Sequence, residues 1–336
     1  MIISRTPFRV SLFGGGTDYP AWFKEHQGSV LGGSIDKYCY ISVRYLPPYF
    51  KHRSRIVYSK EEWVNDVDEI QHPSVRECLK YMDITAGVEI CHQSDLLARK
   101  GLGTSSAFTV GLLNCLRTLR GKETTASTLA KNSIDIEQNW IQENVGCQDQ
   151  YHCAYGGFNQ FDFGNSVGRT PVDASILSPY LMMFDTGTTR IASDIAKTQI
   201  DRVAENDFIL QKMYSMVYMA TGYLNDIKTL GELLNETWDL KKQLSPQITS
   251  AHIDNIYLKA MKAGAYGGKL LGAGGGGYML FLAEPSEQYK VHDVLSDLQF
   301  VPIKFENTGS RIIYNDELLP EKTGWGEEHE AVKTYY

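Results

Sequence analysis

Three glycine-rich segments, widely separated along the chain, constrain this sequence more than any other feature. They are Phe13–Tyr19 (FGGGTDY), Lys100–Ala107 (KGLGTSSA) and Lys269–Gly277 (KLLGAGGGG). Glycine allows positive φ angles and lets the backbone approach a ligand closely, although many glycines mark only a tight turn. The first segment follows a predicted strand, the second opens a predicted helix, and the third lies between a helix and a strand. Each segment is therefore a candidate ligand-binding loop.

Strand-like and helix-like stretches alternate along both halves of the chain. Apolar, β-branched runs predict strands over 2–13, 29–46, 55–59, 88–91, 158–163, 180–184, 278–283, 301–305 and 311–314. Helical spacing of apolar residues predicts helices over 72–82, 102–119, 125–143, 252–263 and 287–298, with further long helices between 191 and 244. Gly, Ser and Pro are frequent near 164–179, which predicts a domain boundary there, with domains at 1–175 and 176–336. Mixed strands and helices in both halves predict an α+β fold of two α/β-type domains.

The charge balance favours a small ligand over a nucleic acid or an acidic membrane surface. There are 33 Lys and Arg residues against 40 Asp and Glu, and no dense basic stripe is present. The longest uncharged run, 101–116, is shorter than the roughly 18–20 apolar residues of a membrane span. The N-terminus carries Arg5 and Arg9 and lacks the apolar core of a secretory signal. The six cysteines form no CxxC pair, which is typical of reduced thiols. We expect a soluble, cytoplasmic protein, and the oligomeric state stays open.

The second glycine-rich segment has the chemistry of a phosphate cradle. Its glycines precede a helix N-terminus, where free N–H groups and the helix dipole favour an anion. Thr104, Ser105 and Ser106 add three hydroxyls that can cap the helix or reach a metal ion; a plain Ser or Thr N-cap is the alternative. The segment is not a Walker A loop, because it lacks the terminal Gly-Lys-Ser/Thr. The third segment contains GxGxxG, but after a helix and before a strand, which excludes a dinucleotide-binding fingerprint.

Three carboxylates are candidates for the chemistry. Glu137 shares the apolar face of its predicted helix with Ile134 and Ile141. A carboxylate on such a face is costly unless it is paired or bound to a cation. A structural ion pair and a Mg²⁺ ligand are both open, and the nearby phosphate cradle favours Mg²⁺. Asp149 and Asp18 lie beside glycines, where an aspartate is often only a turn residue.

These motifs together resemble the GHMP kinases, the family of galactokinase, homoserine kinase, mevalonate kinase and phosphomevalonate kinase. Thr6–Tyr19 resembles the first motif of the family, Gly101–Ala107 its phosphate loop and Lys269–Gly277 its third motif. The resemblance covers nearly the whole chain. It implies a GHMP kinase fold, with an N-terminal α/β domain, a ferredoxin-like C-terminal domain and ATP bound between them. It also implies Mg²⁺-ATP-dependent phosphorylation of a small-molecule hydroxyl.

The resemblance also implies roles for individual residues. Asp149 matches the catalytic aspartate, Arg9 the basic residue beside it, and Glu137 the acidic Mg²⁺ ligand, with Ser105 as the expected hydroxyl ligand. The expected ATP-binding residues form the phosphate loop: Gly101, Leu102, Gly103, Thr104, Ser105, Ser106 and Ala107. The expected substrate-binding residues come from the other loops: Gly15, Gly16, Thr17, Asp18, Arg190, Gly274 and Gly275.

Two details narrow the expected substrate. Galactokinases carry a Glu-His pair where this chain has Gly15-Gly16, which removes a sugar-contacting carboxylate. The Gly-Gly-Gly-Thr-Asp version, together with Asp185–Arg190 (DTGTTR), resembles the bacterial D-glycero-D-manno-heptose 7-phosphate kinases and, less closely, L-fucose kinases. This implies phosphorylation of an anomeric hydroxyl, preferably that of heptose 7-phosphate. The phosphate already on that sugar needs an anion site, for which Arg190 and the Lys51–Arg55 cluster are candidates, with surface residues as the alternative.

Three alternatives stay open within the same fold. One is a kinase for a free sugar such as fucose or another hexose. The second is a decarboxylase of the diphosphomevalonate type, although nothing in the sequence points to an acidic isoprenoid precursor. The third is a non-catalytic sugar-binding sensor. The presence of Arg9, Glu137 and Asp149 together argues against the sensor, because binding alone does not require all three.

Overall fold

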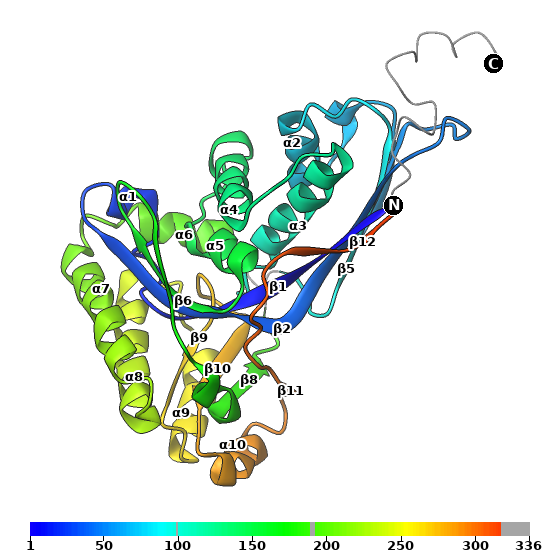
Figure 1. Ribbon diagram of the computed structural model, residues 1–336. Helices are drawn as coiled ribbons and strands as arrows, with labels where there is room; N and C mark the ends of the chain where they lie inside the picture. The colour runs from blue at the N-terminus through cyan, green and yellow to red at the C-terminus, as the bar shows by residue number, and fades with distance from the viewer. Residues whose placement is uncertain (99, 189–191, 317–336) are drawn as a thin grey trace.

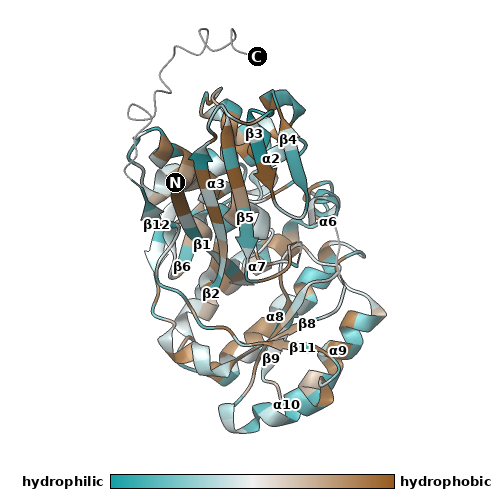
Figure 2. Cartoon of the chain, turned by 90° about the vertical axis from the view of Figure 1, so that its right-hand side faces the viewer, coloured by the Kyte–Doolittle hydropathy of each residue, from teal (hydrophilic) through white to brown (hydrophobic). Residues whose placement is uncertain are grey.

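Two β-sheets organise the chain. The computed structural model describes residues 1–98, 100–188 and 192–316. The first sheet has eight strands in the order β12-β1-β2-β5-β3-β4, with β6 pairing β2 and β7 pairing β6. The second has four strands in the order β11-β8-β10-β9. Figure 2 shows the first sheet in the upper part of the molecule and the second sheet below it, beside α9 and α10.

The long strands β1 (Ile2–Phe13) and β2 (Gly28–Tyr45) form the centre of the first sheet. They pair antiparallel, whereas β3 and β5 pair in parallel. The other strands of this sheet are β3 (Ser54–Val57), β4 (Glu61–Val64), β5 (Val88–Ser94), β6 (Phe158–Phe163), β7 (Gly168–Pro171) and β12 (Arg311–Asn315). The second sheet is antiparallel and consists of β8 (Leu181–Asp185), β9 (Gly267–Leu270), β10 (Tyr278–Leu282) and β11 (Gln299–Val301).

One group of helices covers a face of the first sheet (Figure 1). Its central member, α3 (Thr104–Leu119), packs on β1 and β2 and is buried from Ser106 to Leu116. It ends before Gly121, whose φ of +64° suits a helix stop. The group also contains α2 (Pro73–Tyr81), α4 (Ala126–Asp135) and α5 (Gln148–Tyr155).

A second group of helices packs against the other sheet and against part of the first. Within it, α8 (Ile227–Leu244) packs on β9, and α7 (Asp207–Gly222) packs on β1, β2 and α8. The remaining helices of the described chain are α1 (Pro20–Phe23), α6 (Ala192–Ile200), α9 (Ala251–Lys262) and α10 (Gln288–Val294), with 3₁₀ turns at Val67–Glu69, Ser175–Tyr180 and Pro285–Glu287. Nowhere in the described chain is a helix long and apolar enough to cross a membrane.

The structure confirms the predicted α+β fold and corrects several boundaries. The helix predicted over 125–143 is α-helical only to Asp135 and continues as one π-helical turn, Ile136–Trp140. Asp149, expected after a helix, lies instead in the first turn of α5. The short strands β4, β7 and β9 were not predicted, and Lys269 belongs to β9 rather than to a loop. The last strand, β12, returns to pair with β1 of the first sheet.

Candidate active site

The second and third glycine-rich loops contact each other through their backbones. A Cβ on Gly101 would lie 2.4 Å from the carbonyl oxygen of Leu271, and one on Gly272 would lie 2.4 Å from the Cα of Gly101. Both glycines have positive φ, +82° and +77°. No other residue type fits this approach without displacing backbone. The glycines therefore hold the phosphate loop against the loop that precedes β10.

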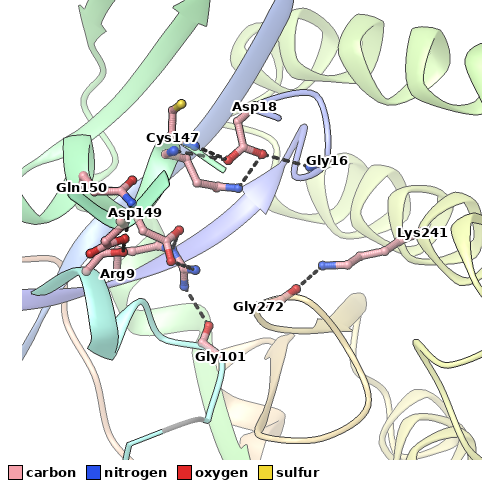
Figure 3. A network of polar contacts seen from close by, with 12 residues as sticks. Arg9, Gly16, Asp18, Gly101, Cys147, Asp149, Gln150, Lys241 and Gly272 are labelled. Atoms are coloured by element: carbon pink, nitrogen blue, oxygen red, sulfur yellow. Dashed lines mark hydrogen bonds and ion pairs between the residues drawn. The ribbon is translucent and has the colours of Figure 1, made fainter. Parts of the chain in front are cut away.

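Arg9 and Asp149 form a two-point ion pair beside the phosphate loop (Figure 3). Arg9 comes from β1, and its Nε and Nη2 donate to the two carboxylate oxygens of Asp149, both at 2.7 Å. Its Nη1 donates to the carbonyl oxygen of Gly101, also at 2.7 Å. Such paired charge-assisted bonds fix both the position and the plane of the carboxylate. Arg9 is 4% exposed, whereas the Asp149 side chain keeps 25% of its surface exposed.

Glu137 is fully buried in the π-helical turn and keeps one oxygen without a hydrogen bond. Its Oε2 accepts from Ser106 Oγ at 2.9 Å and from Gln150 Nε2 at 2.6 Å, whereas Oε1 has no hydrogen-bond partner among the described residues. Burial raises the pKa of Glu137 to about 7, although the nearby Thr109 hydroxyl lowers the pKa in part. An open carboxylate oxygen next to a serine hydroxyl is a donor set that fits Mg²⁺.

No group of three or more His, Cys, Asp and Glu side chains in the described ranges could hold a metal ion. Mg²⁺ at this place would therefore rely on few protein ligands and on phosphate oxygens. In nucleotide sites, Mg²⁺ is usually bound by one or two protein carboxylates together with phosphate oxygens and water.

The three hydroxyls at the start of α3 are not equivalent. The residue that hydrogen-bonds Glu137 is Ser106, which is 2% exposed. Ser105, the expected hydroxyl ligand of Mg²⁺, is exposed, and its role as a ligand stays a prediction. The N-cap of α3 is Gly103 in the left-handed region, and no side chain caps the helix. The alternative of a Ser or Thr N-cap is therefore wrong. Ser106 lies on the side of α3 that meets Glu137, which also accepts from Gln150 of α5, whereas Ser105 lies outside this contact.

Asp18, the expected sugar ligand, is a buried anchor of the first glycine-rich loop, and its contact with substrate stays a prediction. It is 2% exposed and accepts four hydrogen bonds, from the amides of Gly16, Cys147 and Gln148 and from Gln148 Nε2, at 3.0–3.2 Å. Burial raises the pKa of its carboxyl group. Because these donors occupy both oxygens, Asp18 joins the first glycine-rich loop to the start of α5, next to Asp149.

Thr17 is also held by hydrogen bonds inside the protein, and its contact with substrate stays a prediction. It is fully buried, its Oγ1 lies 2.8 Å from the carbonyl oxygens of Gly14 and Ser29, and it accepts from the amide of Ser29 at 3.1 Å. Gly15 and Gly16 are buried in the same loop. The amide of Gly16 donates to Asp18, and contact of Gly15 and Gly16 with substrate stays a prediction.

The remaining predicted substrate residues divide into three cases. The amide of Gly275 donates to the carbonyl of Ile248 at 2.8 Å, and Gly274 packs closely against the backbone of the same residue. Arg190 lies outside the described residues. In the Lys51–Arg55 cluster, Arg55 is paired with Glu61 and Glu89, which neutralise its charge.

Sequence reasoning missed two buried lysines at the loops. Lys100, directly before the phosphate loop, forms an ion pair with Asp185 at the end of β8, with both carboxylate oxygens within 2.8 Å. Lys241 on α8 is 4% exposed and donates to the carbonyl of Gly272. The helix-face argument used for Glu137 would have found Lys241, because it shares a face with Trp238 and Leu244.

Both halves of the chain match family models. Residues 73–157 match the model described as GHMP kinases N terminal domain, and residues 218–298 match GHMP kinases C terminal. The D-glycero-alpha-D-manno-heptose 7-phosphate kinase of Campylobacter jejuni is 27% identical over 86% of this chain and 91% of its own length.

Solved structures share the fold. A D-glycero-D-manno-heptose 1-phosphate kinase from Bacteroides thetaiotaomicron has a TM-score of 0.70 and 22% identity, covering 94% of this chain and 100% of its own. A mevalonate kinase has a TM-score of 0.72 and 18% identity, covering 91% of this chain and 100% of its own. At these identities, the structural likeness concerns the fold alone.

Proposed function

This chain belongs to the GHMP kinase family and is an ATP-dependent sugar or sugar-phosphate kinase, and we propose that it phosphorylates the anomeric hydroxyl of D-glycero-D-manno-heptose 7-phosphate. The observation that carries the proposal is the Arg9–Asp149 pair. It places a rigidly held, partly exposed carboxylate against the phosphate loop, since a Cβ on Gly103 would lie 3.1 Å from Asp149 Oδ2. A carboxylate in this position is placed to receive the proton of an acceptor hydroxyl.

Positioning and charge neutralisation do most of the work in phosphoryl transfer, because the transition state is loose and little covalent chemistry falls to the protein. The phosphates of ATP would lie on the loop Gly101–Ala107, at the uncapped N-terminus of α3, where amide dipoles favour an anion. Asp149 would orient the sugar hydroxyl and accept its proton. Arg9, which holds both oxygens of Asp149, keeps that carboxylate in one orientation.

Mg²⁺, when bound, would neutralise charge on the transferred phosphate. Glu137 Oε1 supports a ligand role, because it is buried and has no hydrogen-bond partner in the described part of the chain. A serine hydroxyl of the first turn of α3 would complete the protein's share, either Ser106, which already contacts Glu137, or Ser105, which faces outward.

The choice of a heptose phosphate rests on two supports. One is the similarity of the whole chain to the Campylobacter enzyme, whose name gives that substrate. The other is the Gly15-Gly16 loop, which brings no carboxylate to the place where galactokinases have one. A free sugar such as fucose is the second candidate, and the experiment separates the two.

The test is ADP release, coupled to a chromogenic reaction, with Mg²⁺-ATP and a panel of sugars. The panel contains heptose 7-phosphate, mannose 6-phosphate, mannose, fucose and galactose. We expect turnover with heptose 7-phosphate at a kcat/KM far above that of any free sugar. Turnover with fucose or another free sugar alone would contradict the substrate, and ATP binding without any turnover would indicate the sensor.

A further inference from the structure

Lys241 is a buried cation that no carboxylate balances directly. Its side chain extends from α8 toward the third glycine-rich loop, and its ammonium donates to the carbonyl oxygen of Gly272 (Figure 3). No ion pair to Lys241 occurs within residues 1–98, 100–188 and 192–316. An ammonium group has three N–H donors. A buried charge without a counter-charge is costly, so the structure points to an anion that is added on ligand binding.

The charged groups around Lys241 are already engaged with other partners. Arg9 on β1, Asp149 on α5, Asp18 in the first loop and Lys269 on β9 all act on it or on its neighbours electrostatically. Asp18 accepts four hydrogen bonds and Asp149 accepts two from Arg9. Lys269 donates to the carbonyl oxygen of Leu12 at 2.9 Å. The two carboxylates are therefore held by other donors.

Lys241 and Arg9 each donate to one of two glycines that contact each other. Arg9 donates to the carbonyl of Gly101, and Lys241 donates to that of Gly272, while Gly101 and Gly272 touch through their backbones. Three nitrogen atoms of Arg9 donate to Asp149 and Gly101, and the carboxylate of Asp149 neutralises the charge of Arg9. Lys241 is thus the cation at this contact whose charge remains to be matched.

We propose that Lys241 is a catalytic residue whose ammonium contacts the phosphoryl group during its transfer from ATP. The proposal rests on the proposed kinase reaction and adds a second cation to it, beside Arg9. The loose transition state spreads negative charge over the phosphoryl oxygens, where a preorganised cation lowers the barrier most. In the absence of ligand, the Gly272 carbonyl holds the ammonium in place.

The test compares Lys241→Met with Lys241→Arg and with the control Lys228→Met, an exposed lysine on the same helix. We expect Lys241→Met to lower kcat by about 10²–10³-fold, with both KM values and the affinity for a non-hydrolysable ATP analogue within a few-fold of wild type. Lys241→Arg should recover part of the loss, and Lys228→Met should match wild type. Thermal melts of each variant show whether it is folded.

A pH profile separates a catalytic role from a purely structural one. Burial lowers the pKa of Lys241 to about 8. We therefore expect kcat/KM of the wild type to fall above that pH, which gives the pH profile an alkaline limb. In Lys241→Arg this decline should vanish, because arginine stays protonated. An unchanged alkaline limb in Lys241→Arg would contradict the proposal.

Three kinetic results would also overturn it. The first is a kcat within about threefold of wild type in folded Lys241→Met, where a lost transition-state contact should cost far more. The second is a rise confined to KM for the sugar phosphate, which would put Lys241 on the phosphate of the sugar. The third is a loss in ATP affinity that accounts for the whole effect. All assays use whichever sugar of the panel the wild type phosphorylates, so a wrong heptose assignment leaves the test of Lys241 intact.

Discussion

At the scale of single residues, hydrogen bonds between side chains and backbone amides fix the catalytic candidate Asp149 in place. Asp18 accepts the amides of Cys147 and Gln148, and Gln148 begins the helix that carries Asp149. The fit leaves no spare room, because a Cβ on Gly146 would lie 2.0 Å from Asp18 Oδ2. Two contacts therefore fix Asp149: Arg9 binds its carboxylate, and Asp18 binds the backbone amides that precede it.

Replacement of Asp149 by asparagine tests its role as the base. Asp149→Asn keeps the size of the side chain but removes the carboxylate that receives the proton. We expect kcat to fall by about 10²–10⁴-fold, the usual contribution of a general base, with ATP binding retained. Asp239→Asn, at an exposed carboxylate on α8, is the control. A kcat within a few-fold of wild type in folded Asp149→Asn would remove Asp149 from the mechanism.

His152 predicts a pH dependence of stability. It is fully buried on α5, neither ring nitrogen has a hydrogen-bond partner in the described structure, and burial lowers its pKa to about 3. Between about pH 6.5 and 3 the unfolded chain binds a proton that the native state excludes. The free energy of unfolding should therefore fall as the pH falls through this window.

The measurement is urea unfolding of wild type and His152→Gln at several pH values between about 4 and 6. The wild type should lose up to about 1.4 kcal/mol more per pH unit than the variant. Equal slopes would show that His152 titrates normally in the native state. The comparison of slopes cancels the contribution of the carboxylates, which both proteins share.

At the scale of elements, backbone contacts between glycine loops build the site. Gly272→Ala would push a methyl group into Gly101 and strain a positive φ. Gly264→Ala is the matched control, since Gly264 also has a positive φ but a Cβ there would meet nothing within 4 Å. We expect Gly272→Ala to raise KM for ATP at least about tenfold more than Gly264→Ala, because displacing the phosphate loop by 1 Å costs on the order of 10²-fold. Equal KM values would show that the loop contact does not position ATP.

Local pattern predicted most of the elements. The spacing and the runs of apolar residues give β1, α2, α3, β6, α9 and β10 within a few residues, because each element contributes many buried side chains along its length. Strands β4, β7 and β9 have only four residues each, too few for a period to show. The π-helical turn at Glu137 was not predicted, since its sequence continues the helical pattern of α4.

The features of the site that could not be predicted from the sequence depend on contacts between segments that are far apart along the chain. The pairing of Arg9 with Asp149 follows the motifs, and the structure brings the two together. The role of Asp18 depends on donors more than a hundred residues away, which no local pattern reveals. The difference between Ser105 and Ser106 depends on which of the two hydroxyls meets Glu137, a contact between segments about thirty residues apart.

At the scale of the whole molecule, one buried ion pair joins the phosphate loop to the second sheet. Lys100 lies directly before Gly101, Asp185 ends β8, and their side chains are 5% and 10% exposed. Asp185 also accepts from the amide of Gly187 at 2.8 Å. The pair therefore links the phosphate loop to the second sheet at the place where ATP is proposed to bind.

A double-mutant cycle tests this link. Removal of one partner leaves a buried charge unpaired, so Lys100→Met and Asp185→Leu should each cost about 3–5 kcal/mol in unfolding free energy. The double variant should cost clearly less than the sum, because no charge is left alone. Additive losses in urea unfolding would mean that the two side chains do not depend on each other.

The identity of the product tests the central claim most directly. Wild-type protein, Mg²⁺-ATP and heptose 7-phosphate are incubated and followed by phosphorus NMR. We predict a new phosphate signal coupled to the anomeric proton of the heptose, in step with the loss of the ATP γ-phosphate, and no such signal with Asp149→Asn. Inorganic phosphate alone, or a new phosphate on any other carbon of the sugar, would contradict the account.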